Sequence, residues 1–439
     1  MSQTADHWTR AVQARLSARL LRDDPRPIAV ALSGGGDSIA LLRLAADWAG
    51  EAGRPLLALT VDHGLNPDSP RWTAFAREQA EAIGADWRGL DWTGDKPTTG
   101  LPAAARRARH RLIADAARQA GARVILFGHT ADDLTEASVM RAGGSTVGDP
   151  REWSPSPAWP EGRGLMLLRP MLSTRRADIR DWLEGQGASW LDDPANTDPR
   201  FARARARTTL QGSASVSSSP TARPTAPLSV RDGGVIVLSR DTPRSALAAG
   251  LVCAGGGDRL PRGDRLGALA GRLTSGADFT AVLAGARLDA NADLVLLMRE
   301  PGELARSGAA PVALQPGVET VWDGRFALTV TEPGWSVAHA SGRLSALSDA
   351  DRASLQPLPP AARAAMPVLI RDGSGDTRLA GEGTEIAGLV EQRLALALDT
   401  TPHEGALDLS THGAQPCNDL FSGAELTGSD ERSEGSRRE

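Results

Sequence analysis

Six consecutive residues near the N-terminus are of the types that bind phosphate. The stretch IAVALSGGGDSIALL begins with apolar residues typical of a buried strand and ends with a helical pattern. Between them stand the residues of the turn: Ser33, Gly34, Gly35, Gly36, Asp37 and Ser38. Glycines permit a tight turn and a close approach to a ligand, and a helix starting there directs its free N–H groups at the turn. The turn therefore predicts an anion site suited to phosphate, with the serine hydroxyls as further donors.

Asp37 is the exception within this turn, because a carboxylate repels a neighbouring phosphate. Its presence indicates either a Mg²⁺ ion held between the two groups or a cap on the following helix. The turn contains neither GxxxxGK followed by Ser or Thr nor GxGxxG, so the sequence does not support the usual P-loop or a dinucleotide fingerprint.

A second group of acids follows a later apolar run, RVILFGH. The string GHTADDLTE places Asp132, Asp133 and Glu136 in the first turns of a helix. Acids at that position favour the helix dipole, which would be a purely structural role. Asp132 and Glu136 are four residues apart and share one side of the helix. Two carboxylates on one side could also hold a cationic amino group or a metal ion.

Basic side chains and imidazoles stand at other points of the same half of the chain. Asp62 and His63 follow an apolar run and fit either a nucleotide contact or a capped surface turn. Arg106 and Arg109 are three residues apart on a helical pattern and share a face. That face suits contact with phosphates of ATP or RNA, or it is a solvated surface.

A further arginine-rich strip follows the turn-forming string DDPANTDPRF. On a helix, Arg200, Arg203 and Arg207 would share one side, with Arg205 beside them. Such a strip suits an RNA backbone, and a solvated helix is the alternative. Upstream of it, Thr174 precedes a helical pattern that carries Arg175, Arg176 and Arg180.

The elements that must position these residues alternate along the first half of the chain. Short aliphatic runs predict strands at Ile28–Leu32, Leu56–Val61 and Val124–Phe127. Helical patterns lie at Ile39–Trp48, Arg71–Ile83, Ala103–Ala120 and Asp132–Arg141. Alternation of this kind predicts an α/β fold with a parallel sheet and helices on both faces. Ligands of such sheets bind beyond the carboxyl ends of the strands, where the polar residues above stand.

The composition changes along the chain and predicts several regions. Residues 1–210 form the α/β domain, and a Ser- and Pro-rich stretch at 211–233 reads as a linker. Residues 234–425 predict a smaller α+β region, with helices near Arg244–Val252 and Asp264–Leu273 and a segment from Leu344 to Val390 that is helical and then irregular. The charged tail at 426–439 is expected to be disordered.

The overall composition excludes several classes of protein. The 439 residues carry a formal net charge of −5, so the chain as a whole is not a general binder of polyanions. The sequence contains one lysine, Lys96, and no tyrosine, which indicates a coding bias and makes arginine abundance alone weak support for nucleic acid. No apolar run reaches the length of a membrane span, and the N-terminus lacks a secretory signal. Two distant cysteines, Cys253 and Cys417, fit a reducing cytoplasm. The sequence indicates no oligomeric state.

Taken in order, these strings resemble the tRNA(Ile)-lysidine synthetases, a family of PP-loop ATP pyrophosphatases. The matching strings are SGGGDS at 33–38, VDHGL at 61–65, ARRARHR at 105–111, GHTADDLTE at 128–136, LRPML at 168–172 and DDPANTDPRFARARAR at 192–207. The resemblance covers the first half of the chain, and it implies a Rossmann-like sheet of the PP-loop/HUP type. It implies ATP-dependent joining of free L-lysine to C2 of the wobble cytidine of a minor isoleucine tRNA with a CAU anticodon.

The resemblance also implies roles for individual residues. The turn from Ser33 to Ser38 would cradle the phosphates of ATP, and Asp37 would orient Mg²⁺. His63 and Arg106 would contact the nucleotide, and Arg109 would act on ATP or substrate in catalysis. The acids expected to grip lysine and assist proton transfer are Asp132, Asp133 and Glu136. The residues expected to position the tRNA are Arg200, Arg203, Arg205 and Arg207.

The sequence departs from the family pattern at three of these strings. His110 stands where an aromatic residue is usual, Ala137 where a threonine is usual, and Ala204 where an asparagine is usual. The alternatives are another PP-loop adenylating enzyme of tRNA modification or a relative that binds ATP or RNA without catalysis. Thiolases of this superfamily generally use paired cysteines, which this sequence lacks.

Overall fold

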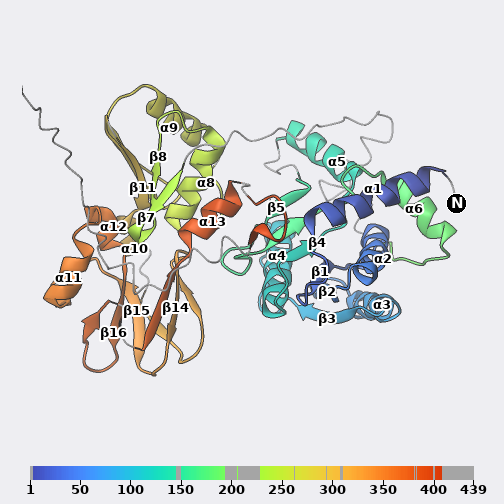
Figure 1. Ribbon diagram of the computed structural model, residues 1–439, viewed down its shortest axis with the longest axis horizontal. Helices are drawn as coiled ribbons and strands as arrows, with labels where there is room; N and C mark the ends of the chain where they lie inside the picture. Colours follow the sequence, from blue (N-terminus) through green and yellow to red (C-terminus); the bar gives the residue numbers. More distant parts are fainter. Residues whose placement is uncertain are drawn as a thin grey trace, which may run out of the picture.

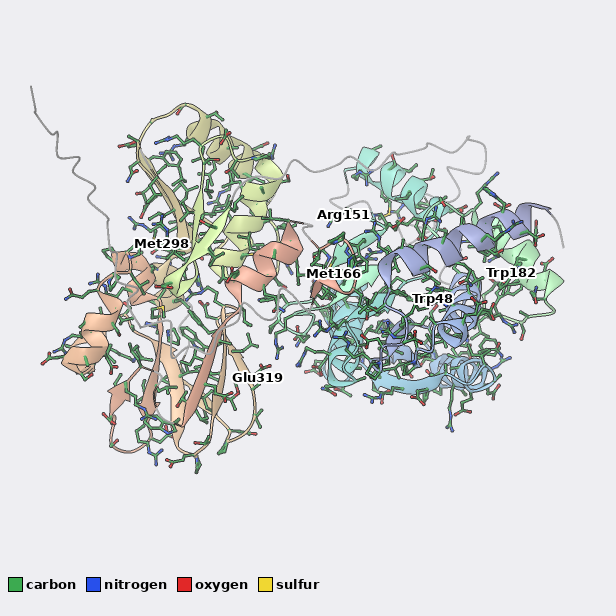
Figure 2. All side chains as sticks on the ribbon, in the orientation of Figure 1. Trp48, Arg151, Met166, Trp182, Met298 and Glu319 are labelled. Atoms are coloured by element: carbon green, nitrogen blue, oxygen red, sulfur yellow. The ribbon has the colours of Figure 1, made fainter. Side chains whose placement is uncertain are left out.

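The computed structural model shows two lobes that lie side by side (Figure 1). It describes residues 3–144, 150–192, 205, 228–261, 263–292, 294–306, 310–379, 381, 383–398 and 401–407. We call residues 3–192 the N-terminal lobe and residues 228–398 the C-terminal lobe. Trp48 and Met166 lie inside the first, and Met298 inside the second (Figure 2).

A six-stranded sheet forms the centre of the N-terminal lobe. Its strands are β1 (Ile28–Ala31), β2 (Leu56–Asp62), β3 (Asp86–Asp91), β4 (Val124–Leu126), β5 (Trp153–Pro155) and β6 (Met166–Leu168). They stand in the order β3-β2-β1-β4-β6-β5, and only β5, at the edge, runs antiparallel to its neighbour. The chain therefore leaves β1 toward one side of the sheet and later returns to β4 on the other side. The crevice at such a switch point is where ligands of doubly wound sheets bind.

Both faces of the inner strands β1, β2, β4 and β6 are buried, as their short aliphatic sequences require. Ile28 and Val30 of β1 pack on one face, and Ala29 between them packs on the other. Side chains of a strand alternate between the two faces, so neighbouring positions must both be apolar when helices cover both. The predicted α/β sheet is confirmed by this arrangement.

Helices cover the two faces unequally. The helices are α1 (Gln3–Arg19), α2 (Gly36–Glu51), α3 (Ser69–Glu81), α4 (Leu101–Gln119), α5 (Ala131–Ala142) and α6 (Arg176–Gly185). Apolar residues of α1, α2, α3 and α6 share one core cluster, and those of α4 contribute to the cluster on the opposite face. The helix α5 starts directly beyond the end of β4.

The C-terminal lobe contains antiparallel sheets and short helices. A five-stranded sheet consists of β7 (Ser229–Arg231), β8 (Val235–Leu238), β11 (Val295–Arg299), β10 (Ala286–Ala290) and β9 (Phe279–Leu283). A four-stranded sheet consists of β12 (Val312–Leu314), β15 (Trp335–His339), β16 (Pro367–Arg371) and β17 (Thr377–Arg378). A three-stranded sheet consists of β13 (Thr320–Trp322), β14 (Phe326–Val330) and β18 (Thr384–Gly388).

The helices of this lobe join its sheets. They are η2 (Asp232–Gly234), α8 (Arg244–Gly255), α9 (Asp264–Thr274), α10 (Pro301–Arg306), η3 (Leu344–Ala346), α11 (Asp349–Leu355), α12 (Pro360–Ala364) and α13 (Val390–Ala397). The predicted irregular structure at the end of the segment from Leu344 to Val390 is wrong, because β16, β17 and β18 lie there. Glycine-rich turns separate these short strands, and β16 and β18 pair with β15 and β14, which are distant in sequence. The predicted linker ends in β7 and η2; its remaining residues and the predicted tail lie outside the described residues.

A short segment after α13 packs into the N-terminal lobe. This segment, residues 401–407, follows α13 toward β5 (Figure 1). The indole Nε1 of Trp153 donates to the carbonyl of Thr401 at 2.6 Å, and Leu407 lies in the same apolar cluster as β1. Glu404 is fully buried and pairs with the buried Arg54, NH1 to Oε2 at 2.9 Å and NH2 to Oε1 at 3.0 Å. Its Oε2 also accepts the N–H of Leu21 at 2.9 Å.

We predict that Glu404→Gln lowers the free energy of unfolding of the N-terminal lobe by about 3–5 kcal/mol, because the Arg54 guanidinium is left as an uncompensated buried charge. The exposed pair Arg77–Glu81 supplies the matched control, and Glu81→Gln is expected to cost less than about 1 kcal/mol. Urea unfolding followed by tryptophan fluorescence measures both. Equal losses in the two variants would contradict the prediction.

Candidate active site

The glycine turn lies at the switch point of the N-terminal sheet. Gly34 has a φ of +83°, a conformation that side chains of L-residues rarely adopt. Its carbonyl accepts the N–H of Leu191 at 2.9 Å, which fixes the turn against the segment after α6. The hydroxyl of Ser38 donates to the carbonyl of Gly35 at 2.8 Å and accepts the N–H of Ser33 at 3.2 Å. The turn is therefore held in shape by the hydroxyl of Ser38 and by the backbone of Leu191 in the segment after α6.

Gly128 allows the end of β4 to approach this turn. A Cβ built at Gly128 would lie 2.9 Å from the carbonyl oxygen of Asp37 and 3.1 Å from its carbonyl carbon. Both obstacles are backbone atoms, so a side chain there could not be accommodated by a rotamer change. The glycine of the string GHTADDLTE thus brings the residues after β4 beside the phosphate-type turn.

Arg176, the first residue of α6, joins the two groups of acids that the sequence placed apart. Its Nε donates to Oδ2 of Asp37 at 3.0 Å, and its NH1 donates to Oε1 of Glu136 at 3.1 Å. Its NH2 lies 3.5 Å from Oδ2 of Asp133. The side chains of Arg176, Asp37, Asp133 and Glu136 are 18%, 24%, 7% and 2% exposed, so one guanidinium balances three largely buried carboxylates.

Two of the acids also accept hydrogen bonds from backbone N–H groups at the starts of helices. Asp132 Oδ2 accepts the backbone N–H of Arg176 at 2.8 Å, at the start of α6. Asp133 Oδ2 accepts the backbone N–H of Thr130 at 2.9 Å and its hydroxyl at 3.1 Å, at the start of α5. Carboxylates satisfy the free donors of a helix start and favour its positive dipole end. Asp132 and Glu136 both contact Arg176, as expected for residues on one side of α5.

Charge and burial oppose each other in this cluster. Burial raises the pKa of Asp37 above its ordinary value, and the positive charge of Arg176 works in the opposite direction. The pKa of Arg176 is raised, because the attraction of Asp37, Asp133 and Glu136 outweighs the effect of burial. Arg176 therefore stays cationic, and its charge favours the ionised form of Asp37, which burial disfavours.

Three histidines lie near the arginines Arg106, Arg109 and Arg169, and their imidazoles are neutral. Burial, with the nearby charge of Arg109, lowers the pKa of His63. Burial lowers the pKa of His129 to about 3, and Arg169 and Arg109 lower it further while Asp133 opposes them. His110 is buried on α4, and burial lowers its pKa to about 2, with Arg109 and Arg106 adding to the effect. These imidazoles are uncharged at neutral pH.

The structure brings most of the sequence-predicted site together. Residues 33–38 and the three acids on α5 meet around Arg176, and His63, Arg106 and Arg109 belong to the electrostatic surroundings of the same strand ends. Arg205 is an exposed helical residue. Arg200, Arg203 and Arg207 lie outside the described residues.

Two arginines of the site were not among the predicted site residues. The sequence places Arg176 only on an arginine-bearing helix and Arg169 only within the string LRPML. The strings LRPML and STRRADIR follow a strand of the same sheet, and this position after a strand was the available signal.

The residues around the turn fit a Mg²⁺ ion bound together with a nucleotide. Only Oδ2 of Asp37 is bonded to Arg176, and Oδ1 has no hydrogen-bond partner among the described residues. Mg²⁺ in nucleotide sites typically takes one or two carboxylates and completes its shell with phosphate oxygens and water. Asp37 Oδ1 is thus a suitable ligand beside the turn.

Comparison with known proteins agrees with this site. A family model of the PP-loop domain matches residues 8–213. The tRNA(Ile)-lysidine synthase of Caulobacter vibrioides is 49% identical over 404 residues, which cover 90% of this chain and 98% of that protein. The chain belongs to the tRNA(Ile)-lysidine synthase family. The family member of Hyphomonas neptunium is 37% identical over 336 residues, covering 69% of this chain and 89% of that protein.

Among solved structures, the U34-tRNA thiolase NcsA from Methanococcus maripaludis is similar with a TM-score of 0.39 and 16% identity. The similar region covers 47% of this chain and 73% of the thiolase chain. The PP-loop family model and the lysidine synthase relatives confirm the family membership inferred from the motifs, and the parallel strands of the N-terminal lobe confirm the predicted fold. No helix among the described residues is long and apolar enough to cross a membrane.

We predict that Arg176→Met destabilises the N-terminal lobe in a pH-dependent manner. Loss of the guanidinium raises the already elevated pKa of Asp37 further. A raised carboxyl pKa in the folded state means that the loss is complete above that pKa and shrinks as the pH falls through it. The loss, about 3–5 kcal/mol for a broken buried pair, should be larger at about pH 8 than at about pH 5.

Urea unfolding at the two pH values measures this difference. Arg77→Met, on α3, removes an exposed partner of Glu81 and serves as the control. A loss that does not change with pH would contradict the electrostatic explanation.

We further predict that Gly128→Ala weakens ATP binding by about tenfold or more, because the new Cβ displaces the backbone of Asp37, and each 1.4 kcal/mol corresponds to a factor of ten. Isothermal titration with ATP measures the affinity. Gly50→Ala, within α2 and with open space around its Cβ, is the control and should keep the affinity of the natural protein. Unchanged affinity in Gly128→Ala would show that the close approach is not needed.

Proposed function

We propose that this protein joins the ε-amino group of L-lysine to C2 of the wobble cytidine of an isoleucine tRNA with a CAU anticodon, and uses ATP to do so. One observation carries the proposal: the turn from Ser33 to Ser38 and the acids of α5 meet at one edge of the sheet, in a chain of the tRNA(Ile)-lysidine synthase family. The turn suits a triphosphate, and the acids suit a cationic amine.

The chemistry of cytidine requires two steps. C2 is a poor electrophile until its oxygen becomes a leaving group. In the first step O2 attacks the α-phosphorus of ATP, and the bond to the β-phosphate oxygen breaks to release pyrophosphate. In the second step the lysine nitrogen attacks C2, loses protons, and the C2–O2 bond breaks to release AMP.

The turn would bind the β- and γ-phosphates through its backbone N–H groups and serine hydroxyls. A bound Mg²⁺ at Asp37 would neutralise phosphate charge. His63 and Arg106 would contact the nucleotide, and Arg109 would stabilise the charge that develops during phosphoryl transfer. The position of Arg109 beside His63, at the end of β2, supports this assignment.

The acids of α5 would bind the lysine amine and accept its proton. An amine must be deprotonated before it attacks, and a carboxylate within reach is a suitable base. Asp132 and Asp133 also bond to backbone donors at the helix starts, so they hold the site in shape in addition to any contact with lysine. Glu136 is bonded through Oε1 to the Arg176 side chain instead. We propose that Glu136 is the carboxylate that binds the lysine amine and accepts its proton.

The tRNA would bind along Arg200, Arg203, Arg205 and Arg207 through its phosphates. We propose a cytoplasmic location for the protein, where isoleucine tRNA and free lysine are both present.

The proposal predicts that purified protein releases AMP and pyrophosphate when ATP, lysine and bulk tRNA are all present. Mass spectrometry of isoleucine tRNA nucleosides after incubation with labelled lysine should show the label on cytidine. Asp37→Asn is expected to lower the rate about a hundredfold or more, as for loss of a group that stabilises transition-state charge. Glu391→Gln, on α13, supplies a control outside the site.

AMP release without incorporation of lysine would reject lysine as the substrate, but it would still support the conclusion that the protein is an adenylating enzyme. Absence of AMP under all conditions would leave a protein that binds ATP or RNA without catalysis.

A further inference from the structure

Arg169 and His129 form a buried pair beside the acid cluster. Arg169 stands directly after β6, His129 stands two residues before the start of α5, and they are 6% and 8% exposed. Nε of Arg169 lies 3.1 Å from Nδ1 of His129. NH1 of Arg169 donates to the carbonyl of Arg151 at 2.7 Å and to Oγ of Ser154 at 3.0 Å. Arg151 is labelled in Figure 2 on the N-terminal lobe. The guanidinium is therefore fixed from both sides.

This contact determines the protonation of the imidazole. A guanidinium donates hydrogen bonds and cannot accept them. Burial lowers the pKa of Arg169 to about 10, so the group is still cationic at neutral pH. Nδ1 of His129 must accordingly be the unprotonated acceptor. The neutral ring then carries its proton on Nε2, which has no hydrogen-bond partner among the described residues.

An aromatic stack fixes the plane of the same ring. Phe127 and His129 are stacked, with centroids 5.9 Å apart and an interplanar angle of 14°. Phe127 also contacts His110, with ring centroids 5.3 Å apart, and the guanidinium of Arg169 lies 5.9 Å from the Phe127 centroid. The ring of His129 is thus held in both plane and tautomer, which are the two requirements for a donor of fixed direction.

We propose that Arg169 is a positioning residue that holds His129 as the Nε2–H tautomer, and that this N–H donates a hydrogen bond to an α-phosphate oxygen of ATP as O2 of cytidine attacks. The inference rests on the proposed function. His129 follows Gly128, where a Cβ would lie only 2.9 Å from the carbonyl oxygen of Asp37, so His129 stands next to the phosphate turn in the fold. A fixed, water-poor donor of this kind stabilises charge that develops in the transition state.

The tautomer can be measured without any substrate. Protein labelled with ¹⁵N-histidine is examined by long-range ¹H–¹⁵N correlation, and His129→Gln identifies the His129 signals by their loss. We expect an unprotonated Nδ1 and a protonated Nε2 at neutral pH. In Arg169→Met the two tautomers should become mixed, whereas Arg118→Met, which removes an arginine from the surface of α4, should leave the signals unchanged.

Kinetics of AMP formation test the role of the donor. His129→Leu should lower kcat about a hundredfold with little change in KM for ATP, the pattern of an interaction made mainly in the transition state. His129→Gln retains an amide N–H near the position of Nε2, so it should keep a rate within about tenfold of the natural protein. Arg169→Met should lower kcat by about ten- to a hundredfold, as for loss of a partner that orients a site residue.

Three results would overturn the inference: an Nδ1–H or cationic His129 in the natural protein, an unchanged tautomer in Arg169→Met, or equal rates for His129→Leu and the natural protein. If Arg169→Met does not fold, the tautomer of the natural protein and the comparison of His129→Gln with His129→Leu still decide it. Failure of the proposed function is separate, because it shows as absent lysine incorporation by the natural protein.

Discussion

The ion pairs between Arg176 and the carboxylates of Asp37, Asp133 and Glu136 are the interaction on which the site depends. Three acids in a largely buried space repel one another, and each loses hydration. A single planar guanidinium with donors in several directions offsets both costs. It also links the first residues of α2, α5 and α6, so the electrostatic requirement of the acids and the alignment of three helix starts are met by one side chain.

The order of strands explains why residues so distant in sequence meet there. The turn after β1 and the segment after β4 belong to adjacent strands, and the segment after β6 follows from the next one. Gly128 lets the second segment lie against the first, and the Asp132 carboxylate bonds to the first residue of α6 in the third. The acidic part of the site is built around Arg176, and Arg169 holds the imidazole of His129.

Local patterns were sufficient to predict the strands β1, β2 and β4 and the turn after β1, because both faces of these strands are buried and the glycines are adjacent. The strand β3 gave no such signal, since its string DWRGLD lies at an edge with most side chains exposed or half-exposed. Of the strands in the C-terminal lobe after Leu344, β16 and β18 were missed because they are short and pair with distant partners, and β17 because it has only two residues. Arg176 could be placed on a helix but not in the site, because its carboxylate partner Asp37 is 139 residues away.

The segment at 401–407 has a consequence for the synthesis of the protein. The N-terminal lobe is made first, yet the carboxylate that neutralises Arg54 and the apolar side chain of Leu407 leave the ribosome roughly 200 residues after that lobe ends, during which time the lobe is able to begin folding. Until then a buried guanidinium has no counter-ion and part of the core is open to water. Completion of the N-terminal lobe therefore depends on synthesis of residues 401–407, and a chain that terminates before them is left with an unstable first half.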